Sequence, residues 1–477
     1  MSKDIYIDDL EIKKQDEFIA KVKIISDDHC AKLGAKPLAH VRTYGCQQNM
    51  NDGEKLKGYL CEMGYELTGS PEGTEVVLYN TCAIRENAEV RVFGNVGALK
   101  NEKRKNENLI IGICGCMPTQ PHIADKIRKR YRYVDLVFDT HALYKLPELL
   151  YQKLKGQENV YSTSPQDGKI AEIPIIHRDS EFKANLPIMY GCNNFCTYCI
   201  VPYVRGRERS RQFEDIVSEA KSLVQAGYKE ITLLGQNVNS YGNDNDDDRK
   251  FPQLLRELND IDGEFLIKFM TSHPKDCNEE LIDTIRDCKK ISRNLHLPVQ
   301  SGSDKILKAM NRKYTSEDYL KLVEYAKKEI PDIVLTSDII VGFPNETKQD
   351  FDKTIDLIKK VRFHSLFTFI YSPRAGTVAA EMIDNTSDSD KAEWFKILLE
   401  TQKKIGLEVY DAHIGEDMRV LVDGKAKQEG HLSTRTDTGI IVDLCGGADK
   451  IGEFVNVKII GSKRNVLIGE EKFPANN

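Results

Sequence analysis

Hydrophobic and polar positions change their spacing twice along the chain, which divides it into three patterned regions. In the first region, 38–155, short apolar runs are separated by longer amphipathic stretches. This alternation favours an α/β domain with a doubly wound parallel sheet, in which each helix connects two parallel strands. The apolar runs lie at 40–44, 75–80, 109–113 and 134–138, and the helical stretches lie at 52–63, 85–105 and 120–130.

Two less regular segments flank this domain. The N-terminal extension, 1–37, mixes charged and apolar residues without a long periodic segment, and we expect it to pack on the body of the protein. The polar stretch 156–180 contains the run Ser162–Gly168, whose serine, proline, aspartate and glycine are typical of a connection. We therefore predict that 156–180 is a linker to the next domain.

The second region, 181–411, again alternates strand and helix signals. Six strand-like runs with helices between most of them predict an open or partial (β/α)6 barrel, whose active site is expected at the carboxyl ends of its strands. The six runs lie at 186–191, 230–236, 265–271, 294–299, 334–343 and 365–371.

The third region, 412–474, changes to short alternating runs with turn signals between them. Such a pattern predicts a small antiparallel β-barrel, similar to the OB-like modules that bind nucleic acid. Basic and acidic residues are almost equally frequent there, so its charge does not establish RNA binding, and a packing role is the alternative. The predicted strands lie at 418–423, 431–435, 439–444, 454–461 and 466–469.

Three cysteines occur within eight residues directly after the first barrel strand. Cys192, Cys196 and Cys199 have the spacing C-x3-C-x2-C. Thiolate is the soft ligand that iron–sulfur clusters prefer, and three ligands leave one position of a four-iron cluster open for a small molecule. The alternative is a zinc knuckle whose fourth ligand lies elsewhere in the chain.

A second set of three cysteines follows three consecutive predicted strands of the first domain. Ligands of such sheets bind outside the carboxyl ends of the strands, so Cys46, Cys82 and Cys116 are expected to lie close together. The alternative is three unrelated buried cysteines, because a free cysteine packs like a small apolar residue. Cys114 competes with Cys116, since residues i and i+2 of a strand share a face.

The ends of the barrel strands carry glycine and polar residues that together outline a cofactor pocket. Glycine allows a ligand to approach the backbone closely. His273 taken alone would be a structural histidine rather than a base. The expected cofactor-binding residues are Tyr198, Gly235, Gln236, Ser272, His273, Gln300 and Gly342.

Charge and composition limit the possible partners. The net charge of −6 gives no whole-chain attraction for nucleic acid, so any RNA contact must use a local patch. Arg is suited to bidentate phosphate contact, and arginines alternate directly after the cysteine loop. The predicted RNA-binding residues are Arg205, Arg207, Arg209 and Arg211.

The whole chain of 477 residues is 30% charged and 40% hydrophobic. No apolar run approaches the roughly 18 residues of a membrane span, and the acidic start does not resemble a secretory signal. Disulfides do not persist in the cytosol, so twelve cysteines in such a chain indicate metal or redox chemistry. We expect a cytoplasmic monomer.

Several motifs together resemble one family. The cysteine loop, with Tyr198 directly before the last cysteine, is similar to that of the radical S-adenosylmethionine (SAM) enzymes. The wider match, over about 38–474, resembles the radical SAM methylthiotransferases, which have a methylthiotransferase N-terminal domain (here 38–155), a radical SAM domain (181–411) and a TRAM domain (412–474). The motifs are Thr43–Asn49, Asn80–Ala88, Gly115–Met117, Pro202–Arg211 and Leu295–Ser303.

The run Asn80–Ala88 resembles the MiaB type of this family, which converts N6-isopentenyladenosine next to the anticodon of tRNA to its 2-methylthio derivative. The resemblance implies two [4Fe–4S] clusters, SAM, a tRNA anticodon stem-loop, an external one-electron reductant and a sulfur donor. It also implies that the cluster on Cys192, Cys196 and Cys199 cleaves SAM. The cluster on Cys46, Cys82 and Cys116 would then carry the sulfur.

Two residues depart from the family's usual pattern, Gln48 in place of methionine and Asn345 in place of glycine, and both affect only the fine geometry of the pockets. Two alternatives share the cluster residues. One is a methylthiotransferase that acts on another tRNA adenosine derivative or on a ribosomal protein. The other is a non-enzymatic iron–sulfur sensor or electron carrier that binds RNA, which would not need a SAM pocket.

Overall fold

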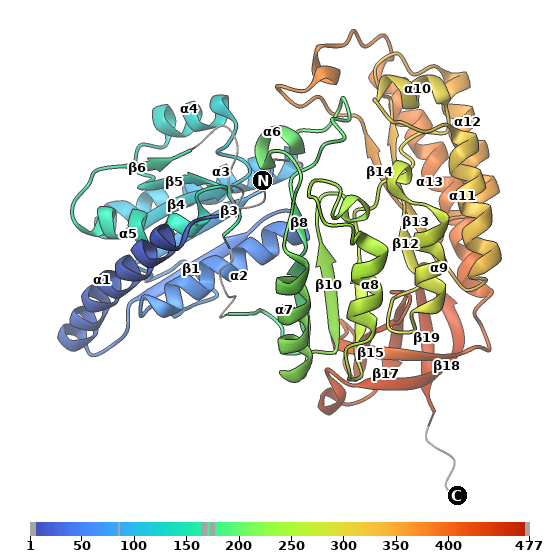
Figure 1. Ribbon diagram of the computed structural model, residues 1–477. Helices are drawn as coiled ribbons and strands as arrows, with labels where there is room; N and C mark the ends of the chain where they lie inside the picture. The colour runs from blue at the N-terminus through green and yellow to red at the C-terminus, as the bar shows by residue number, and fades with distance from the viewer. Residues whose placement is uncertain (1–5, 84–85, 164–168, 172–176, 473–477) are drawn as a thin grey trace, which may run out of the picture. The chain divides into compact units, whose positions relative to one another are not determined.

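The computed structural model describes residues 6–83, 86–163, 169–171 and 177–472 (Figure 1). Ile84 and Arg85 of the predicted family motif lie outside the described residues. The chain forms two compact units, which we describe separately. Unit 1 comprises 1–180, 189–193 and 199–211, and unit 2 comprises 181–188, 194–198 and 212–477.

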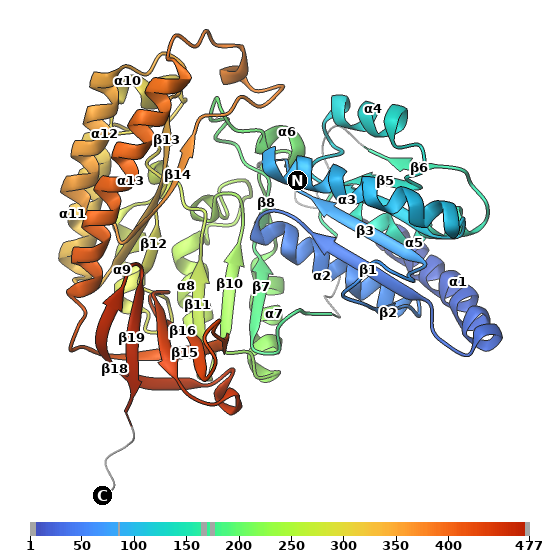
Figure 2. The ribbon, with the colours of Figure 1, turned by 180° about the vertical axis from the view of Figure 1, so that it is seen from behind.

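Unit 1 contains the predicted doubly wound sheet. Its six strands are all parallel and lie in the order β2-β1-β3-β4-β5-β6 (Figure 2). Apolar residues of α1, α2 and α5 pack on one face of the sheet, and those of α3 and α4 pack on the other. The strands are β1 (Leu38–Thr43), β2 (Glu66–Leu67), β3 (Val76–Thr81), β4 (Ile110–Gly115), β5 (Leu136–Asp139) and β6 (Val160–Ser162), and the helices are α1 (Asp9–Leu33), α2 (Gln47–Glu62), α3 (Glu86–Lys105), α4 (Pro121–Arg130) and α5 (Leu146–Leu154).

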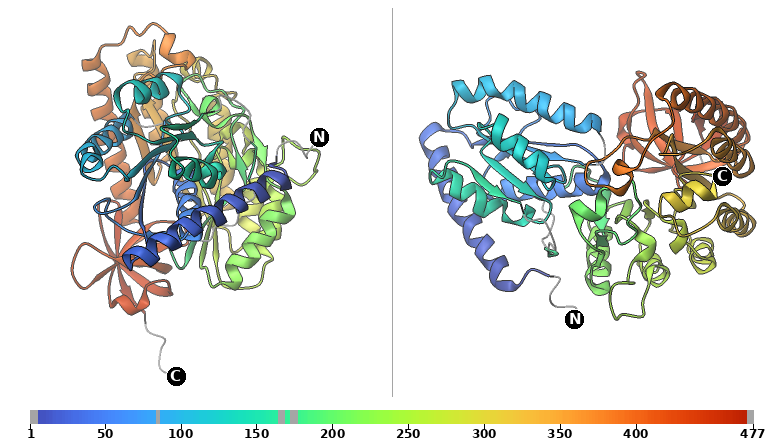
Figure 3. Two further views of the ribbon diagram at one scale, coloured as in Figure 1. Left: turned by 90° about the vertical axis from the view of Figure 1, so that its left-hand side faces the viewer. Right: turned by 90° about the horizontal axis from the view of Figure 1, so that it is seen from above.

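Both irregular segments contain regular structure that the sequence did not predict, although the N-terminal extension packs on the body of the protein as expected. The N-terminal extension contains α1, a helix of 25 residues that packs along α5 (Figure 3). Asp8 caps α1 by accepting a hydrogen bond from Glu11 N, and Lys14 and Gln15 both donate to Glu148 of α5. Within the predicted linker, Val160–Ser162 pairs with β5 as the edge strand β6 of the sheet. The chain between β6 and Ser180 is therefore the connection.

Unit 2 contains the predicted six-stranded half-barrel. Its parallel strands form two three-stranded sheets, β11-β10-β7 and β12-β13-β14. The strands are β7 (Lys183–Pro187), β10 (Glu230–Leu234), β11 (Leu266–Phe269), β12 (Asn294–His296), β13 (Val334–Val341) and β14 (Ser365–Ile370), and the helices are α7 (Phe213–Gln225), α8 (Phe251–Asn259), α9 (Glu279–Asp287), α10 (Asp304–Ala309), α11 (Ser316–Glu329), α12 (Lys348–Val361) and α13 (Asp388–Asp411).

The burial pattern of β13 distinguishes the two faces of its sheet. Leu335, Ser337, Ile339 and Val341 are buried, whereas Thr336, Asp338 and Ile340 are only half-buried. Tyr319 of α11 donates to Leu297 O, as does Ser337 Oγ, so the buried face is the one that the helices cover. The half-buried face is the inner, open face of the half-barrel.

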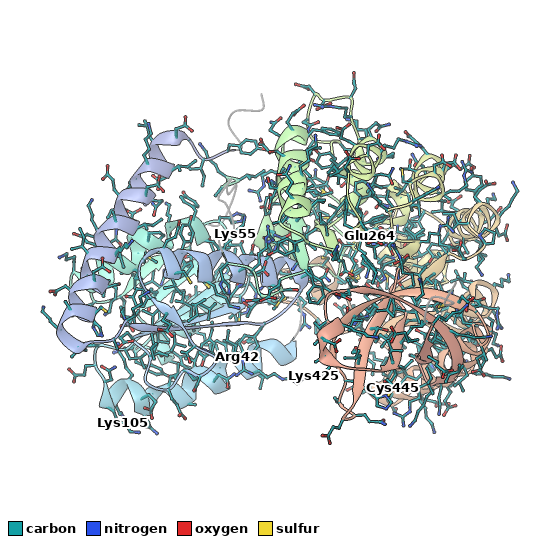
Figure 4. All side chains as sticks on the ribbon, turned by 90° about the horizontal axis from the view of Figure 1, so that it is seen from below. Arg42, Lys55, Lys105, Glu264, Lys425 and Cys445 are labelled. Atoms are coloured by element: carbon teal, nitrogen blue, oxygen red, sulfur yellow. The ribbon has the colours of Figure 1, made fainter. Side chains whose placement is uncertain are left out.

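The C-terminal strands form a closed barrel in the order β15-β16-β17-β19-β18. Four of its strand pairs are antiparallel and the pair β17–β19 is parallel, an order consistent with the predicted OB-like module. The barrel is attached to the rest of unit 2 by Ser292 Oγ, which donates to Asp437 O, and by Arg419, which binds Glu264. Figure 4 labels Glu264, together with Lys425 and Cys445 of the barrel. The strands are β15 (Asp417–Lys425), β16 (His431–Thr436), β17 (Ile441–Cys445), β18 (Phe454–Lys463) and β19 (Val466–Glu471).

Candidate functional site

Three cysteines of unit 1 lie at the carboxyl ends of adjacent strands. Cys46 follows β1, Cys82 follows β3 and Cys116 follows β4. The strand order reverses between β1 and β3, because β2 lies on the opposite side of β1. In doubly wound sheets this switch point is where a ligand binds. The sheet therefore places the three thiols where a ligand site is expected.

Asn49 connects the three cysteines. Its side-chain oxygen lies 3.6 Å from Cys46 Sγ and 3.7 Å from Cys116 Sγ, and Cys46 is also hydrogen-bonded to Cys82. The Asn49 amide nitrogen donates to Tyr44 O at 3.2 Å and to Thr81 O at 2.8 Å, which fixes the side chain between the strand ends. The sequence analysis did not identify Asn49, although its position three residues after Cys46 at the start of a helix was a usable signal.

A glycine decides which cysteine of β4 joins this group. Gly115 has a φ of 95°, and a Cβ there would lie 2.5 Å from Asn80 Oδ1. This left-handed turn ends the alternation of the strand, so Cys114 and Cys116 no longer share a face. The Cys114 thiol is buried in the core and lies 3.7 Å from Tyr79 O, whereas Cys116 lies beside Asn49. Alternation left Cys114 and Cys116 as alternatives, and the structure places Cys116, not Cys114, beside the other cysteines of this group.

Arg205 supplies a buried positive charge next to Asn49, the residue that contacts Cys46 and Cys116. It is only 6% exposed, and its Nη2 donates to Asp52 Oδ2 at 2.7 Å and to Asn49 Oδ1 at 2.8 Å. Arg205 ends the short helix α6 (Val201–Arg205), and Arg209 Nη2 donates to its carbonyl oxygen. Because this guanidinium is buried and already hydrogen-bonded, an RNA phosphate cannot reach it. The prediction that Arg205 binds RNA is therefore wrong.

The other three arginines of the predicted RNA patch differ in exposure. Arg211 is buried like Arg205, which also removes it from the patch. Arg207 is exposed and Arg209 is half-buried. Only Arg207 and Arg209 therefore keep a surface that an RNA phosphate can reach.

The surroundings of Cys46 and Cys116 shift the pKa values of the two thiols in opposite directions. The hydrogen bond with Cys82 and the nearby Arg205 guanidinium lower the pKa of Cys46 to about 6. Burial raises the pKa of Cys116 to about 11. A protonated thiol must lose its proton to bind metal, and a bound metal supplies the driving force for this loss. Cys46 is thus the more easily ionised of these two thiols, and Cys116 would lose its proton on metal binding.

Among the described residues, no group of three or more His, Cys, Asp or Glu side chains is arranged to hold a metal ion. The three thiols are the soft ligands that iron–sulfur clusters use.

We predict that Asp52→Ala destabilises unit 1 by about 3–5 kcal/mol, because it leaves the buried Arg205 charge without its partner. The free energy of unfolding is measured by hydrogen exchange of α2 peptides in increasing urea. The control is Asp332→Ala, which breaks the surface pair between Asp332 and Arg293 and should cost no more than about 1 kcal/mol. Equal, small effects of both substitutions on their own units would contradict this prediction.

The cysteine loop 192–199 is held through separate contacts in each unit. In unit 1, Cys192 N donates to Gly206 O at 3.1 Å. In unit 2, Thr197 donates to Ala309 O and Met310 O, and Asn311 Nδ2 donates to Phe195 O. Arg312 Nη1 lies 3.4 Å from Cys196 Sγ and 3.5 Å from the hydroxyl of Tyr198. Arg312 is a second site residue that the sequence analysis missed.

The strand ends of the half-barrel present buried polar atoms without partners. Among the described residues, Ser272 Oγ, His273 Nε2 and Gln300 Oε1 have no hydrogen-bond partner. Leaving such atoms unsatisfied is costly, so their concentration at one rim indicates a polar ligand. Thr271 and Gln300 also have positive φ values of 67° and 72°, a conformation that is unusual for these residues and typical of functional sites.

His273 is set up as a neutral hydrogen-bond donor. Its Nδ1 accepts a hydrogen bond from Lys275 N at 3.1 Å, so the proton of the neutral ring is on Nε2. Burial, together with the Arg312 charge, lowers the pKa of His273 to about 2, which keeps the ring neutral. The side chain can therefore donate to a ligand oxygen but does not act as a cation.

The remaining residues of the predicted pocket lie at the same rim. Gly235 O accepts a hydrogen bond from Thr271 Oγ1 at 2.7 Å, and Gln236 follows it as a half-buried residue. Gly342 ends β13 with a φ of 72°, and a Cβ there would lie 2.5 Å from Lys391 Cγ. The residues at this rim fit the amino, carboxylate and hydroxyl groups that a ligand such as SAM carries.

Two phenylalanines on the open face of the half-barrel were not predicted. Phe367 and Phe369 alternate on the edge strand β14 and are 48% and 45% exposed. They pair in register with Asp338 and Ile340 of β13, and Ile340 N donates to Gln300 O at 3.0 Å. This apolar surface is therefore continuous with the rim that carries Gln300.

Three family models match the chain in the order of its domains. The matches are to "Uncharacterized protein family UPF0004" over residues 39–139, to the Radical SAM superfamily over 186–358 and to the TRAM domain over 411–471. Among solved structures, the radical SAM methyltransferase TsrM of Kitasatospora setae has a TM-score of 0.53 at 13% identity. That match covers 85% of this chain and 82% of TsrM, and it supports the fold alone.

Curated relatives match almost the whole chain. The tRNA-2-methylthio-N(6)-dimethylallyladenosine synthase of Thermoanaerobacter pseudethanolicus is 50% identical over 98% of this chain and 99% of its own length. The proteins of the same name from Acetivibrio thermocellus and Clostridioides difficile are 50% and 47% identical, and each match covers at least 94% of both chains. The chain therefore belongs to the family of tRNA-2-methylthio-N(6)-dimethylallyladenosine synthases, within the radical SAM superfamily.

Proposed function

We propose that this protein methylthiolates carbon 2 of N6-isopentenyladenosine next to the anticodon of tRNA. The observation that carries this proposal is the pairing of a radical SAM cysteine loop with three further cysteines at the switch point of an N-terminal sheet. Family membership at about half identical residues supports it. Carbon 2 carries an unactivated C–H bond, which general acid–base catalysis cannot break, and a radical cofactor supplies the required chemistry.

The radical SAM superfamily uses SAM and a [4Fe–4S] cluster, and we propose that this chain holds two clusters. Cys192, Cys196 and Cys199 would hold the one that cleaves SAM, and Cys46, Cys82 and Cys116 the one that carries the sulfur. When bound, these cofactors supply a radical that removes the hydrogen of carbon 2 and a methylated sulfur that replaces it. An external one-electron reductant and a separate sulfur donor complete the reaction.

The residues of the chain would bind and orient these groups. His273 Nε2–H would donate to an oxygen of SAM, and the side-chain oxygen of Gln300 would accept from one of its donors. Arg207 and Arg209 would contact phosphates of the RNA, and the C-terminal TRAM barrel would add further RNA contacts.

The exposed pair Phe367 and Phe369 gives a physical basis for recognition of the isopentenyl group. Burying an apolar CH2 group contributes about 0.8 kcal/mol, so five carbons can outweigh the few kcal/mol that unstacking a base costs. The His296 ring packs edge-to-face on Phe367 at 5.6 Å, and its Nε2 lies 3.4 Å from Asp338 Oδ1. An apolar surface beside polar groups is what a prenylated adenine would require.

The experiment uses purified protein, SAM, a reductant and two versions of one anticodon stem-loop, with and without the isopentenyl group. We expect methylthiolation of the prenylated version only. The double substitution Phe367→Ala and Phe369→Ala should weaken binding of the prenylated stem-loop by tenfold or more, with little effect on the unprenylated one. Leu399→Ala is the control, since it removes an exposed apolar side chain from helix α13, which carries no proposed RNA contact.

The outcomes separate the alternatives. Equal methylthiolation of both stem-loops by the unmodified protein would refute prenyl recognition. Reaction with neither would favour a methylthiotransferase that acts on a protein. If the double variant still prefers the prenylated stem-loop, the proposed reaction stands, but Phe367 and Phe369 do not recognise the isopentenyl group.

A further inference from the structure

Arg312 is a buried arginine in unit 2, in the turn between α10 and α11. Its side chain is 7% exposed. Nη2 donates to Pro298 O at 2.6 Å, and Nε donates to the hydroxyl of Tyr314 at 2.8 Å. The third edge of the guanidinium faces the cysteine loop, with Nη1 at 3.4 Å from Cys196 Sγ. Together with the Tyr198 hydroxyl, at 3.5 Å from Nη1, these groups fix the cation in one orientation.

The charge of Arg312 is not balanced by a carboxylate. No Asp or Glu in the part of the chain that the structure describes forms an ion pair with it, and its polar neighbours are a carbonyl, two tyrosine hydroxyls and one thiol. By contrast, Arg205 in unit 1 pairs with Asp52 at 2.7 Å. An isolated buried cation is strongly unfavourable, so an anion is expected beside Arg312 in the working protein.

Cys196 is the neighbour that can supply this negative charge. A cysteine becomes a thiolate when it binds a metal, whereas a tyrosine hydroxyl and a carbonyl stay neutral near neutral pH. A four-iron cluster with three thiolates carries a net negative charge in both of its working oxidation states. The Arg312 guanidinium and the proposed cluster thus have opposite charges, and Arg312 contacts Cys196, one of the proposed ligands.

We propose that Arg312 is a positioning residue whose guanidinium is the counter-charge of the cluster on Cys192, Cys196 and Cys199 and favours its reduction. This inference rests on the proposed function, which places a cluster on these cysteines. In the reduction, one electron passes from a one-electron donor to the oxidised cluster, and no covalent bond forms or breaks. The added negative charge lies next to a fixed positive charge, so the reduced state is stabilised. The hydrogen bond from Nη1 to Cys196 Sγ acts in the same direction.

The test measures the reduction potential of this cluster rather than turnover. The parent is the full-length chain with Cys46, Cys82 and Cys116 changed to Ala, so that only one cluster contributes. Anaerobically reconstituted samples are titrated with a one-electron reductant and followed by electron paramagnetic resonance. Arg312→Gln should make reduction at least tenfold less favourable, a shift of about 59 mV to more negative potential. Arg312→Lys keeps the positive charge, so its reduction potential should lie close to that of the parent.

The matched control is Arg293→Gln, which removes an exposed arginine of unit 2 that pairs with Asp332 and should leave the potential unchanged. A potential of Arg312→Gln equal to that of the parent, at equal iron content, would overturn the inference. If the parent itself binds no iron, the cluster assignment fails, and the inference fails with it.

A second measurement covers the case in which Arg312→Gln does not load iron. Arg312→Met replaces the cation by an apolar side chain of similar length. Because the metal-free parent contains an uncompensated buried charge, its unfolding temperature should be no higher than that of the metal-free variant. Iron loading should raise the unfolding temperature more in the parent than in Arg312→Met. An equal rise in both would show that Arg312 only packs, which contradicts the proposal.

Discussion

Replacing Cys192, Cys196 and Cys199 together with Ala is expected to remove about half of the iron of the anaerobically reconstituted protein. Two four-iron clusters hold about eight irons, and each cluster needs its three thiolates. The same variant should cleave no SAM and methylthiolate no RNA, because the cluster that supplies the electron is lost. Iron is counted per chain by colorimetric assay, and 5′-deoxyadenosine is measured by chromatography.

The chain provides a matched control for this experiment. Cys30, Cys61 and Cys445 are also free cysteines, they are half-buried or exposed, and none of them belongs to either group. Changing these three to Ala removes the same number of thiols and should leave both iron content and SAM cleavage intact. Full iron in the loop variant would contradict the assignment of the loop, and halved iron in the control would show that thiol number rather than position decides.

The sequence predicted the architecture well where apolar residues face a core on a regular spacing. The parallel sheet of unit 1, the half-barrel and the closed C-terminal barrel were all confirmed. Helix α1 was missed for a physical reason. Only Gln15, Val22 and Ser26 of its 25 residues are buried, so its sequence shows no apolar stripe, although its capping residue Asp8 was visible. The bounds of the linker failed because β6 is a short edge strand.

The arginine patch shows why spacing alone did not describe the site. Alternating arginines suggest a strand with one basic face, but the pattern begins in a helix and only Arg209 and Ser210 form a strand. Arg205, at the end of that helix, therefore points into unit 1 and binds Asp52. Alternation could not separate Cys116, the predicted ligand, from Cys114 for a similar reason, because a period of two does not continue through the positive φ of Gly115.

Arg312 had no local signal at all. It lies 116 residues after Cys196 in the sequence, and the two meet only because α10 and the following turn pack on the cysteine loop. We singled out Arg312 because no carboxylate among the described residues pairs with it. This can be seen only in the folded structure. Buried polar atoms without partners at Ser272, His273 and Gln300 carry information of the same kind.

The second large effect is expected at the cysteines of unit 1. Cys46→Ala, Cys82→Ala and Cys116→Ala should each leave reductive cleavage of SAM intact, because the hydrogen bonds that hold Cys196 and Thr197 are made within unit 2. Methylthiolation of the prenylated stem-loop should fall below detection. Each variant removes one of the three ligands of the cluster that we propose carries the sulfur.

Cys114→Ala is the closest control for Cys116→Ala, since both cysteines are buried and only Gly115 separates them. The Cys114 thiol faces the core, so its removal should cost some stability but keep full iron and methylthiolation. Cys116 contacts Asn49 beside Cys46, so its removal should halve the iron and end sulfur transfer while 5′-deoxyadenosine still forms. Loss of SAM cleavage in folded Cys116→Ala would refute the division of labour between the two groups of cysteines. Loss of methylthiolation in both Cys114→Ala and Cys116→Ala would instead show that any substitution at the end of β4 stops the reaction. The iron content of the two variants would then be the measurement that tests whether Cys116 is a cluster ligand.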